Sequence, residues 1–162
     1  MAAVETYFSL GSNLGDRSAL LERALQMMQD RLPGVMEAVS SPYESAPQGF
    51  DSPNRFLNLA ARFRLELPET EEAALQVLDI CQDIERELGK NVQAPRFDAR
   101  GQRIYADRPI DIDLIFLGSL RLDHPRLTLP HPRWQERDFV RIPLREVASP
   151  ELLRIIDNHV AS

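Results

Sequence analysis

The sequence is poor in several kinds of residue, and each shortage excludes a class of protein. It has one cysteine, Cys81, so neither a disulfide framework nor a cysteine metal cluster is possible. The apolar spacing around Cys81 predicts a buried structural residue on a helix. No stretch approaches the ~20 apolar residues of a membrane span, and no basic segment followed by an apolar run opens the chain. We therefore expect a cytoplasmic protein without a membrane partner.

Basic charge is also scarce, and it is carried almost wholly by arginine. The net charge of -6 argues against a dedicated nucleic-acid binder, and Lys90 is the only lysine. Neither a Walker loop nor a Gly-x-Gly-x-x-Gly segment occurs. If the protein binds ATP, arginine side chains and magnesium must therefore do the work that backbone amides do in those folds.

The 162 residues, 43% of them hydrophobic, predict one domain over residues 1–162. Apolar periodicity predicts strands at residues 6–10, 35–43, 56–65 and 110–117, and helices at 18–32, 70–88 and 133–140. Gly118-Ser119 suits a hairpin turn into residues 120–122. Two strand–helix units closed by a hairpin predict an α+β fold with a mostly antiparallel sheet.

Asp111 and Asp113 interrupt an otherwise apolar strand. The period of two puts both carboxylates on one face, together with Ile115 and Leu117, with Cα atoms roughly 6.6 Å apart. Two oxygen ligands at this separation suit magnesium, which keeps waters and takes further ligands from substrate phosphates. The alternative is a strand with one solvated face that happens to carry two acids.

Other residues suggest what the acids would act on. Arginines surround the pair in sequence and resemble a cage for a polyphosphate, although a solvated charged surface is the alternative for each one. His131, held between two prolines, could donate to a phosphate or serve as a structural donor. Phe56 and Asn58 project to the same side of their strand. An aromatic face beside an amide suits a flat heterocycle, but core packing is the alternative.

Several motifs, in this order along the chain, resemble the 6-hydroxymethyl-7,8-dihydropterin pyrophosphokinase family. The motifs are Gly11-Ser12-Asn13-Leu14-Gly15, Tyr43-Glu44-Ser45-Ala46-Pro47, Phe56-Leu57-Asn58, Gln82-x-x-Glu85, Arg108-Pro109-Ile110-Asp111-Ile112-Asp113, Arg126-Leu127-Thr128-Leu129-Pro130-His131 and Arg137-Asp138-Phe139. The run into the two aspartates and the Leu-Thr-Leu-Pro-His run are specific when found together at this spacing.

The resemblance implies a ferredoxin-like α/β sandwich, a usually monomeric protein and two Mg²⁺ ions. It implies transfer of pyrophosphate from ATP to the pterin alcohol, with AMP as the second product. By matching position, Asp111 and Asp113 would hold both metals and act with Arg108 and His131 in catalysis. The implied ATP contacts are Gln82, Glu85, Arg108, Leu114, Arg126, Thr128, His131 and Arg137. The implied pterin contacts are Ser45, Pro47, Gln48, Phe56, Asn58, Asp111 and Phe139.

Two other functions stay open at this point. One is a magnesium-dependent phospho- or nucleotidyltransferase with a different heterocyclic acceptor, and the other is a non-catalytic nucleotide-binding domain. The polar segment 91–104 is predicted to be a mobile surface loop, and Arg96, Arg100 or Arg103 within it could close over ATP. The sequence offers no dedicated general base.

Overall fold

The computed structural model describes residues 3–46, 55–89 and 109–161. Its helices and strands follow one another as β1 (Val4–Ser12), α1 (Arg17–Arg31), β2 (Gly34–Val39), β3 (Tyr43–Ser45), β4 (Phe56–Leu65), α2 (Glu71–Glu87), β5 (Asp111–Leu117), β6 (Leu122–His124), β7 (Leu127–Leu129), α3 (Asp138–Val147) and α4 (Pro150–Ala161). None of the helices described is long and apolar enough to span a membrane.

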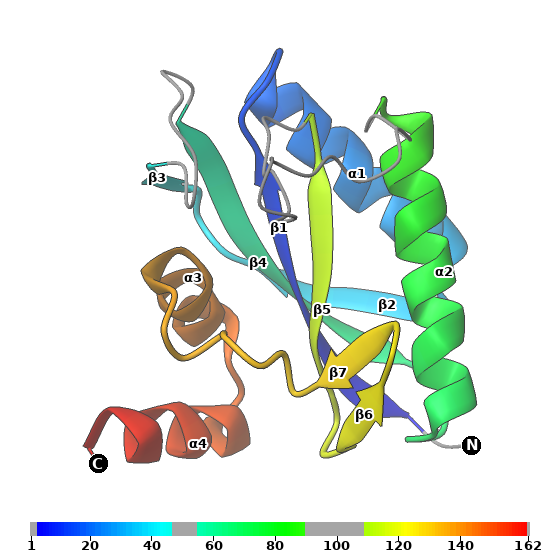
Figure 1. Ribbon diagram of the computed structural model, residues 1–162, viewed down its shortest axis with the longest axis vertical. Helices are drawn as coiled ribbons and strands as arrows, with labels where there is room; N and C mark the ends of the chain where they lie inside the picture. Colours follow the sequence, from blue (N-terminus) through cyan, green and yellow to red (C-terminus); the bar gives the residue numbers. More distant parts are fainter. Residues whose placement is uncertain (1–2, 47–54, 90–108, 162) are drawn as a thin grey trace, which may run out of the picture.

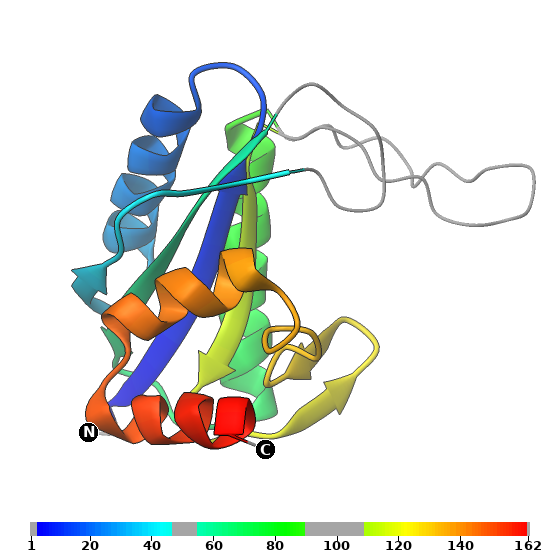
Figure 2. The ribbon, with the colours of Figure 1, turned by 90° about the vertical axis from the view of Figure 1, so that its left-hand side faces the viewer.

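The main sheet is antiparallel, with the strand order β2-β4-β1-β5 and with β3 also paired to β4 (Figure 1). Helices α1 and α2 cover one face of this sheet, while α3 and α4 lie on the other (Figure 2). The four long strands β1, β2, β4 and β5 form a ferredoxin-like sandwich with helices α1 and α2. The predicted α+β fold with a mostly antiparallel sheet is confirmed.

Local signals fix the two long helices. The Asp16 side chain accepts a hydrogen bond from Ala19 N at 3.1 Å, and Thr70 caps α2 in the same way through Ala73 N at 3.2 Å. Gly89, at φ +94°, follows the end of α2, where a left-handed residue is favoured. The capped helices bring apolar stripes onto the sheet, where they pack with side chains of the strands in the larger core cluster.

The two faces of the sheet have separate cores. The cluster under α1 and α2 runs along the whole face and includes Leu10, Leu59, Phe63, Ile112 and Leu114. The cluster under α3 and α4 is smaller and occupies one end only, around Tyr7, Ala60, Ile115, Phe116, Trp134 and Leu144. The other end of that second face lies beside the beginning of β4 and β5, where no described helix covers it (Figure 2).

The predicted hairpin after β5 is wrong. Gly118 and Ser119 do form a turn, closed by Leu120 N on Leu117 O at 3.1 Å, but β6 pairs with β7 and not with β5. The outer edge of β5 is occupied by other groups, because His131 N donates to Ile115 O at 3.0 Å and a buried glutamate of α2 accepts from Ile112 N. A separate two-stranded sheet results.

Three further expectations need correction. The predicted strand 35–43 is divided into β2 and β3. Ser40 N still donates to Ala60 O of β4, but the next residue, Ser41, donates to Glu146 of α3, which interrupts the pairing with β4. The helix expected at 133–140 begins later, at Asp138, and continues through Pro143, which is buried. Leu117 lies in the core under α1 and α2 and not on the face of Asp113, because β5 shifts register against β1 at Tyr7/Phe8. Helix α4 was not predicted.

Candidate active site

Two rows of paired residues cross three strands at the uncovered end of the sheet and at its border with the covered end. Gly11 of β1 is paired with Asn58 of β4 on one side and with Asp111 of β5 on the other. Ser9 is paired in the same way with Ala60 and Asp113. Paired residues of antiparallel strands point to the same face. At about 4.8 Å per strand, the backbones of Asn58 and Asp111 lie roughly 10 Å apart, so one substrate assembly can contact both.

Asp111 and Asp113 are half-buried on this face, and Ile112 between them is buried on the opposite one. The structure thus places the two carboxylates as the alternation predicted. Among the described residues no three His, Cys, Asp or Glu side chains form a metal cluster. Two carboxylates fit a hard cation that keeps waters and takes its other ligands from phosphates, as magnesium does. A cation that needs a full protein cage, such as structural zinc, fits less well.

His131 lies beside β5 with its ring orientation fixed. Its Nδ1 accepts a hydrogen bond from Arg133 N at 3.2 Å, so the neutral ring carries its hydrogen on Nε2. Burial lowers the pKa of His131, as do the charges of Arg137 and Arg133, while Asp111 acts in the opposite direction. The ring is therefore a neutral donor at pH 7, placed between the aspartates and the start of α3.

Arg126 is held against α2 by two side chains. Its guanidinium donates to Asp79 Oδ1 at 2.6 Å and to Gln82 Oε1 at 3.1 Å. Gln82 and Arg126 were both predicted to contact ATP, and the structure brings them together. Asp79 escaped the sequence analysis, although its position three residues before Gln82 on a predicted helix places it on the same face. The Asp79 carboxylate orients the Arg126 guanidinium and would also compete with phosphate oxygens for its N–H donors.

The acceptor end of the face centres on Asn58, which is 3% exposed. Its amide nitrogen donates to Tyr43 O and to Ser45 Oγ, both at 2.8 Å. Because both amide hydrogens are used, the oxygen is oriented toward the face as an acceptor. A Cβ on Gly11 would lie 3.1 Å from that oxygen and 3.5 Å from Phe56 Cδ1. Gly11 thus keeps this surface clear, a role that a glycine inside a strand pattern could have indicated.

Phe56 and Phe139 border the same region from two elements. Phe56 is half-buried at the start of β4, opposite Ser45 of β3. Phe139 is half-buried at the start of α3, which packs against β3 and β4. The Arg137 guanidinium lies 5.7 Å from the Phe139 ring centroid, within cation–π range. These aromatic rings suit a flat ligand between β4 and α3.

The remaining predicted residues are exposed, buried or outside the described residues. Thr128, two residues after Arg126 in the sequence, is exposed on β7. Leu114 has its side chain in the core, so only its backbone could contact ATP. Glu85 is buried beneath β5. Cys81 is buried as predicted, and burial raises the pKa of its thiol. Outside the described residues lie Pro47, Gln48, Arg96, Arg100, Arg103 and Arg108.

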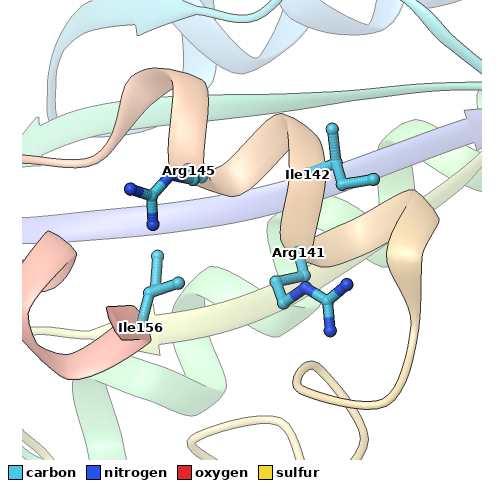
Figure 3. A pocket seen from close by; sticks show the side chains of 4 residues that line it. All are labelled: Arg141, Ile142, Arg145 and Ile156. Carbon is cyan, nitrogen blue, oxygen red and sulfur yellow. The ribbon is translucent and has the colours of Figure 1, made fainter. Parts of the chain in front are cut away.

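A pocket on the surface lies elsewhere, between α3 and α4 (Figure 3). It is lined by Arg141, Ile142, Arg145 and Ile156. Both arginines are already engaged, Arg141 with Asp138 and Arg145 with Asp157. None of the residues lining it belongs to the predicted site, so this pocket does not extend the row of polar residues described above.

The chain is similar to proteins of known activity along most of its length. Residues 7–149 match the profile of the family described as 7,8-dihydro-6-hydroxymethylpterin-pyrophosphokinase. The 2-amino-4-hydroxy-6-hydroxymethyldihydropteridine pyrophosphokinase of Porphyromonas gingivalis is 45% identical over 88% of this chain and 89% of that protein. The enzyme of the same name from Bacillus subtilis is 32% identical over 87% of this chain and 76% of its own length.

A solved structure agrees at the level of the fold. A crystallised HPPK-DHPS chain in complex with substrates superposes with a TM-score of 0.62 at 14% identity, covering 90% of this chain and 40% of the other. The sequence matches, in contrast, include two relatives above 30% identity that are covered over 89% and 76% of their own length. The chain therefore belongs to the 7,8-dihydro-6-hydroxymethylpterin-pyrophosphokinase family.

Proposed function

We propose that the uncovered end of the sheet is where this chain performs the reaction of its family. As a member, the chain is an ATP-dependent diphosphotransferase of folate biosynthesis, which transfers pyrophosphate from ATP to 6-hydroxymethyl-7,8-dihydropterin. The observation that carries the assignment of the site is the row Asn58–Gly11–Asp111. It sets a heterocycle-reading amide and a cation-binding carboxylate on one face, about two strand spacings apart.

The Asp111 and Asp113 side supports the nucleotide. Magnesium bound there would neutralise phosphate charge and make the acceptor hydroxyl easier to deprotonate. We propose two such ions, both held by this pair. His131 Nε2–H, the Arg137 guanidinium and the Arg126–Gln82 pair supply donors along one border of the site. Donors of this kind bind phosphate oxygens and stabilise charge that develops on them.

The Asn58 side supports the pterin. The amide oxygen of Asn58 accepts a donor of the ring, because its nitrogen is committed to Tyr43 and Ser45. Phe56 and Phe139 offer the apolar faces between which a flat ring can stack. Ser45 is itself a partner of Asn58, and Pro47 and Gln48 follow it closely in the sequence. We keep all three as predicted contacts.

The chemistry follows from this arrangement of charge. The hydroxymethyl oxygen bonds to the β-phosphorus of ATP, the bond from that phosphorus to the α–β bridging oxygen breaks, and AMP leaves with that oxygen. The hydroxyl proton passes to solvent, because no side chain of the described site is placed as a dedicated base. The protein contributes by holding both substrates in line and by donating hydrogen bonds to the phosphates.

The decisive assay mixes purified protein, magnesium, ATP and the reduced pterin alcohol, and scores AMP against ADP. We expect AMP to form only when the pterin is present. ADP as the product would indicate single-phosphoryl transfer, and AMP release without pterin would indicate hydrolysis. Asp111→Asn should abolish the AMP signal, which ties the reaction to this face. We also keep as predictions that the enzyme works as a monomer and in the cytoplasm.

A further inference from the structure

Strand β5 carries both aspartates and is the last strand of its sheet among the described residues, where it pairs within that sheet with β1 alone. An edge strand has backbone N–H groups without a strand partner, and these need another acceptor. Ile112, the residue between the two aspartates, donates its N–H to Glu85 Oε2 at 3.0 Å. The backbone between the candidate metal ligands is therefore anchored by a side chain from another element.

Glu85 is an unusual choice for that position. It is 5% exposed and belongs to the buried stripe of α2 that includes Val77, Cys81 and Ile84. A leucine there would continue the stripe, whereas a buried carboxylate loses hydration and must recover it through hydrogen bonds. An N–H bond to an ionised carboxylate is also stronger than one to a neutral oxygen. The bond from Ile112 N to the Glu85 carboxyl group attaches β5 directly to α2.

We propose that Glu85 is a positioning residue for the Asp111/Asp113 pair. Its carboxylate holds the peptide between them from the face opposite to the site. With that peptide fixed, the two aspartate side chains keep the spacing and direction that a shared cation requires. This inference rests on the proposed function, and it gives Glu85 a role through β5 in addition to the predicted contact with ATP.

Two variants separate the parts of this role. Glu85→Gln keeps an oxygen of similar shape and removes the charge, while Glu85→Ala removes the acceptor. Glu87→Gln is the matched control, because Glu87 lies on the same helix and pairs on the surface with Arg31. Three quantities are measured for each: hydrogen exchange of the Ile112 amide in metal-free protein, the Mg²⁺ concentration that gives half-maximal AMP formation, and the KM for the pterin.

We expect Glu85→Ala to speed exchange at Ile112 and to raise the half-saturating Mg²⁺ concentration roughly tenfold or more, as loss of an outer partner of a metal ligand does. Glu85→Gln should lie between this variant and the wild type. The pterin KM should change less than about twofold, and Glu87→Gln should match the wild type throughout. If Glu85→Ala does not fold, the Glu85→Gln comparison carries the same test.

Faster exchange at Ile112 with a normal Mg²⁺ requirement would overturn the proposal, because Glu85 would then only satisfy an edge amide. Unchanged exchange would overturn it as well. Failure of the proposed function gives a different result: Asp111→Asn would keep full pterin-dependent AMP formation. The two hypotheses can thus fail separately.

Discussion

The two faces of the main sheet are built from the same strands, but one is covered along its whole length and the other only in part. On one face, apolar side chains run from end to end and are covered by α1 and α2. On the other, apolar packing under α3 and α4 stops at Ala60 and Ile115, and the residues beyond are Asn58, Asp111 and Asp113. Alternation along a strand thus lets neighbouring residues serve stability and chemistry separately. The site is the part of the second face that α3 and α4 leave uncovered.

Removal of the proposed metal ligands should have the largest effect, and it tests whether activity and stability depend on different faces of the sheet. Asp111→Ala or Asp113→Ala should lower the rate of AMP formation roughly 1,000-fold or more, since a bound cation contributes several kcal/mol of charge stabilisation. Thermal unfolding should stay close to that of the wild type, because neither carboxylate belongs to a core cluster. Steady-state kinetics and circular dichroism melting measure the two effects.

Asp30→Ala is the control for that experiment, because Asp30 is an exposed acid on α1, on the packed side of the sheet. It should leave both activity and stability unchanged. A near-normal rate in either site variant would refute the metal assignment. A large drop in unfolding temperature would show that the aspartates stabilise the fold.

Phe56 and Phe63 test the comparison within one strand, because they lie on opposite faces of β4. Phe63 is fully buried and makes an edge-on contact with Phe8 at 5.4 Å between ring centroids. Phe63→Ala should destabilise the protein by about 3–5 kcal/mol and leave the pterin KM of the folded fraction unchanged. Phe56→Ala should do the reverse, raising that KM about tenfold through lost stacking. Urea unfolding and kinetics separate the two.

The pair also defines what would count against it. If Phe56→Ala weakened ATP and pterin equally, Phe56 would not be part of an acceptor subsite. Equal stability losses in both variants would mean that the second face is packed as tightly as the first at this end.

Gly11→Ala probes the open space between the two ends of the site. The new methyl group would lie 3.1 Å from Asn58 Oδ1, so the amide must shift by a few tenths of an ångström. Crowding of this size costs about 1–3 kcal/mol, and the pterin KM should rise roughly tenfold while the ATP KM stays nearly constant. Added to Asn58→Ala, the substitution should have little further effect, because its target is gone. Additive losses in the double variant would contradict this.

The sequence predicted the parts of the fold that alternation and caps control. The bounds of β4 and the shared face of Asp111 and Asp113 follow directly from a period of two. The predictions for the regions after β5 were wrong, because the groups that bond to an edge strand come from distant parts of the sequence. No local pattern shows that His131 N would occupy the edge of β5, or that a register shift would turn Leu117 away from Asp113.

The site was predicted by motif more than by physics. Asp111, Asp113, His131 and Asn58 stand close to one face as the resemblance implied, and their roles remain predictions. Partners that act through other residues escaped notice. Asp79 and the amide-clearing role of Gly11 depend on contacts between distant segments, so single-sequence patterns do not reveal them.

The smallest expected effect concerns how β3 and β4 are held together at the acceptor end. Arg17, the first residue of α1, donates to Glu44 Oε1 at 3.2 Å and to Arg55 O at 2.9 Å. It therefore grips one residue of β3 and the residue before β4. Arg17→Met should raise the pterin KM about two- to fivefold, because half-exposed ion pairs contribute only 0.2–1 kcal/mol. The ATP KM should not change.

Arg31→Met supplies the matched control, since Arg31 makes a similar surface pair with Glu87 between α1 and α2, on the packed side of the sheet. Because that pair joins two helices on the face of the sheet opposite to Asn58, its loss should leave the pterin KM as it is. High salt should reproduce part of the Arg17→Met effect in the wild type by screening the charge pair. Equal pterin KM values for both variants and the wild type would show that the β3–β4 pairing does not depend on the Arg17 contacts. The bond between Asn58 and Ser45 would then be sufficient to hold the acceptor end in place.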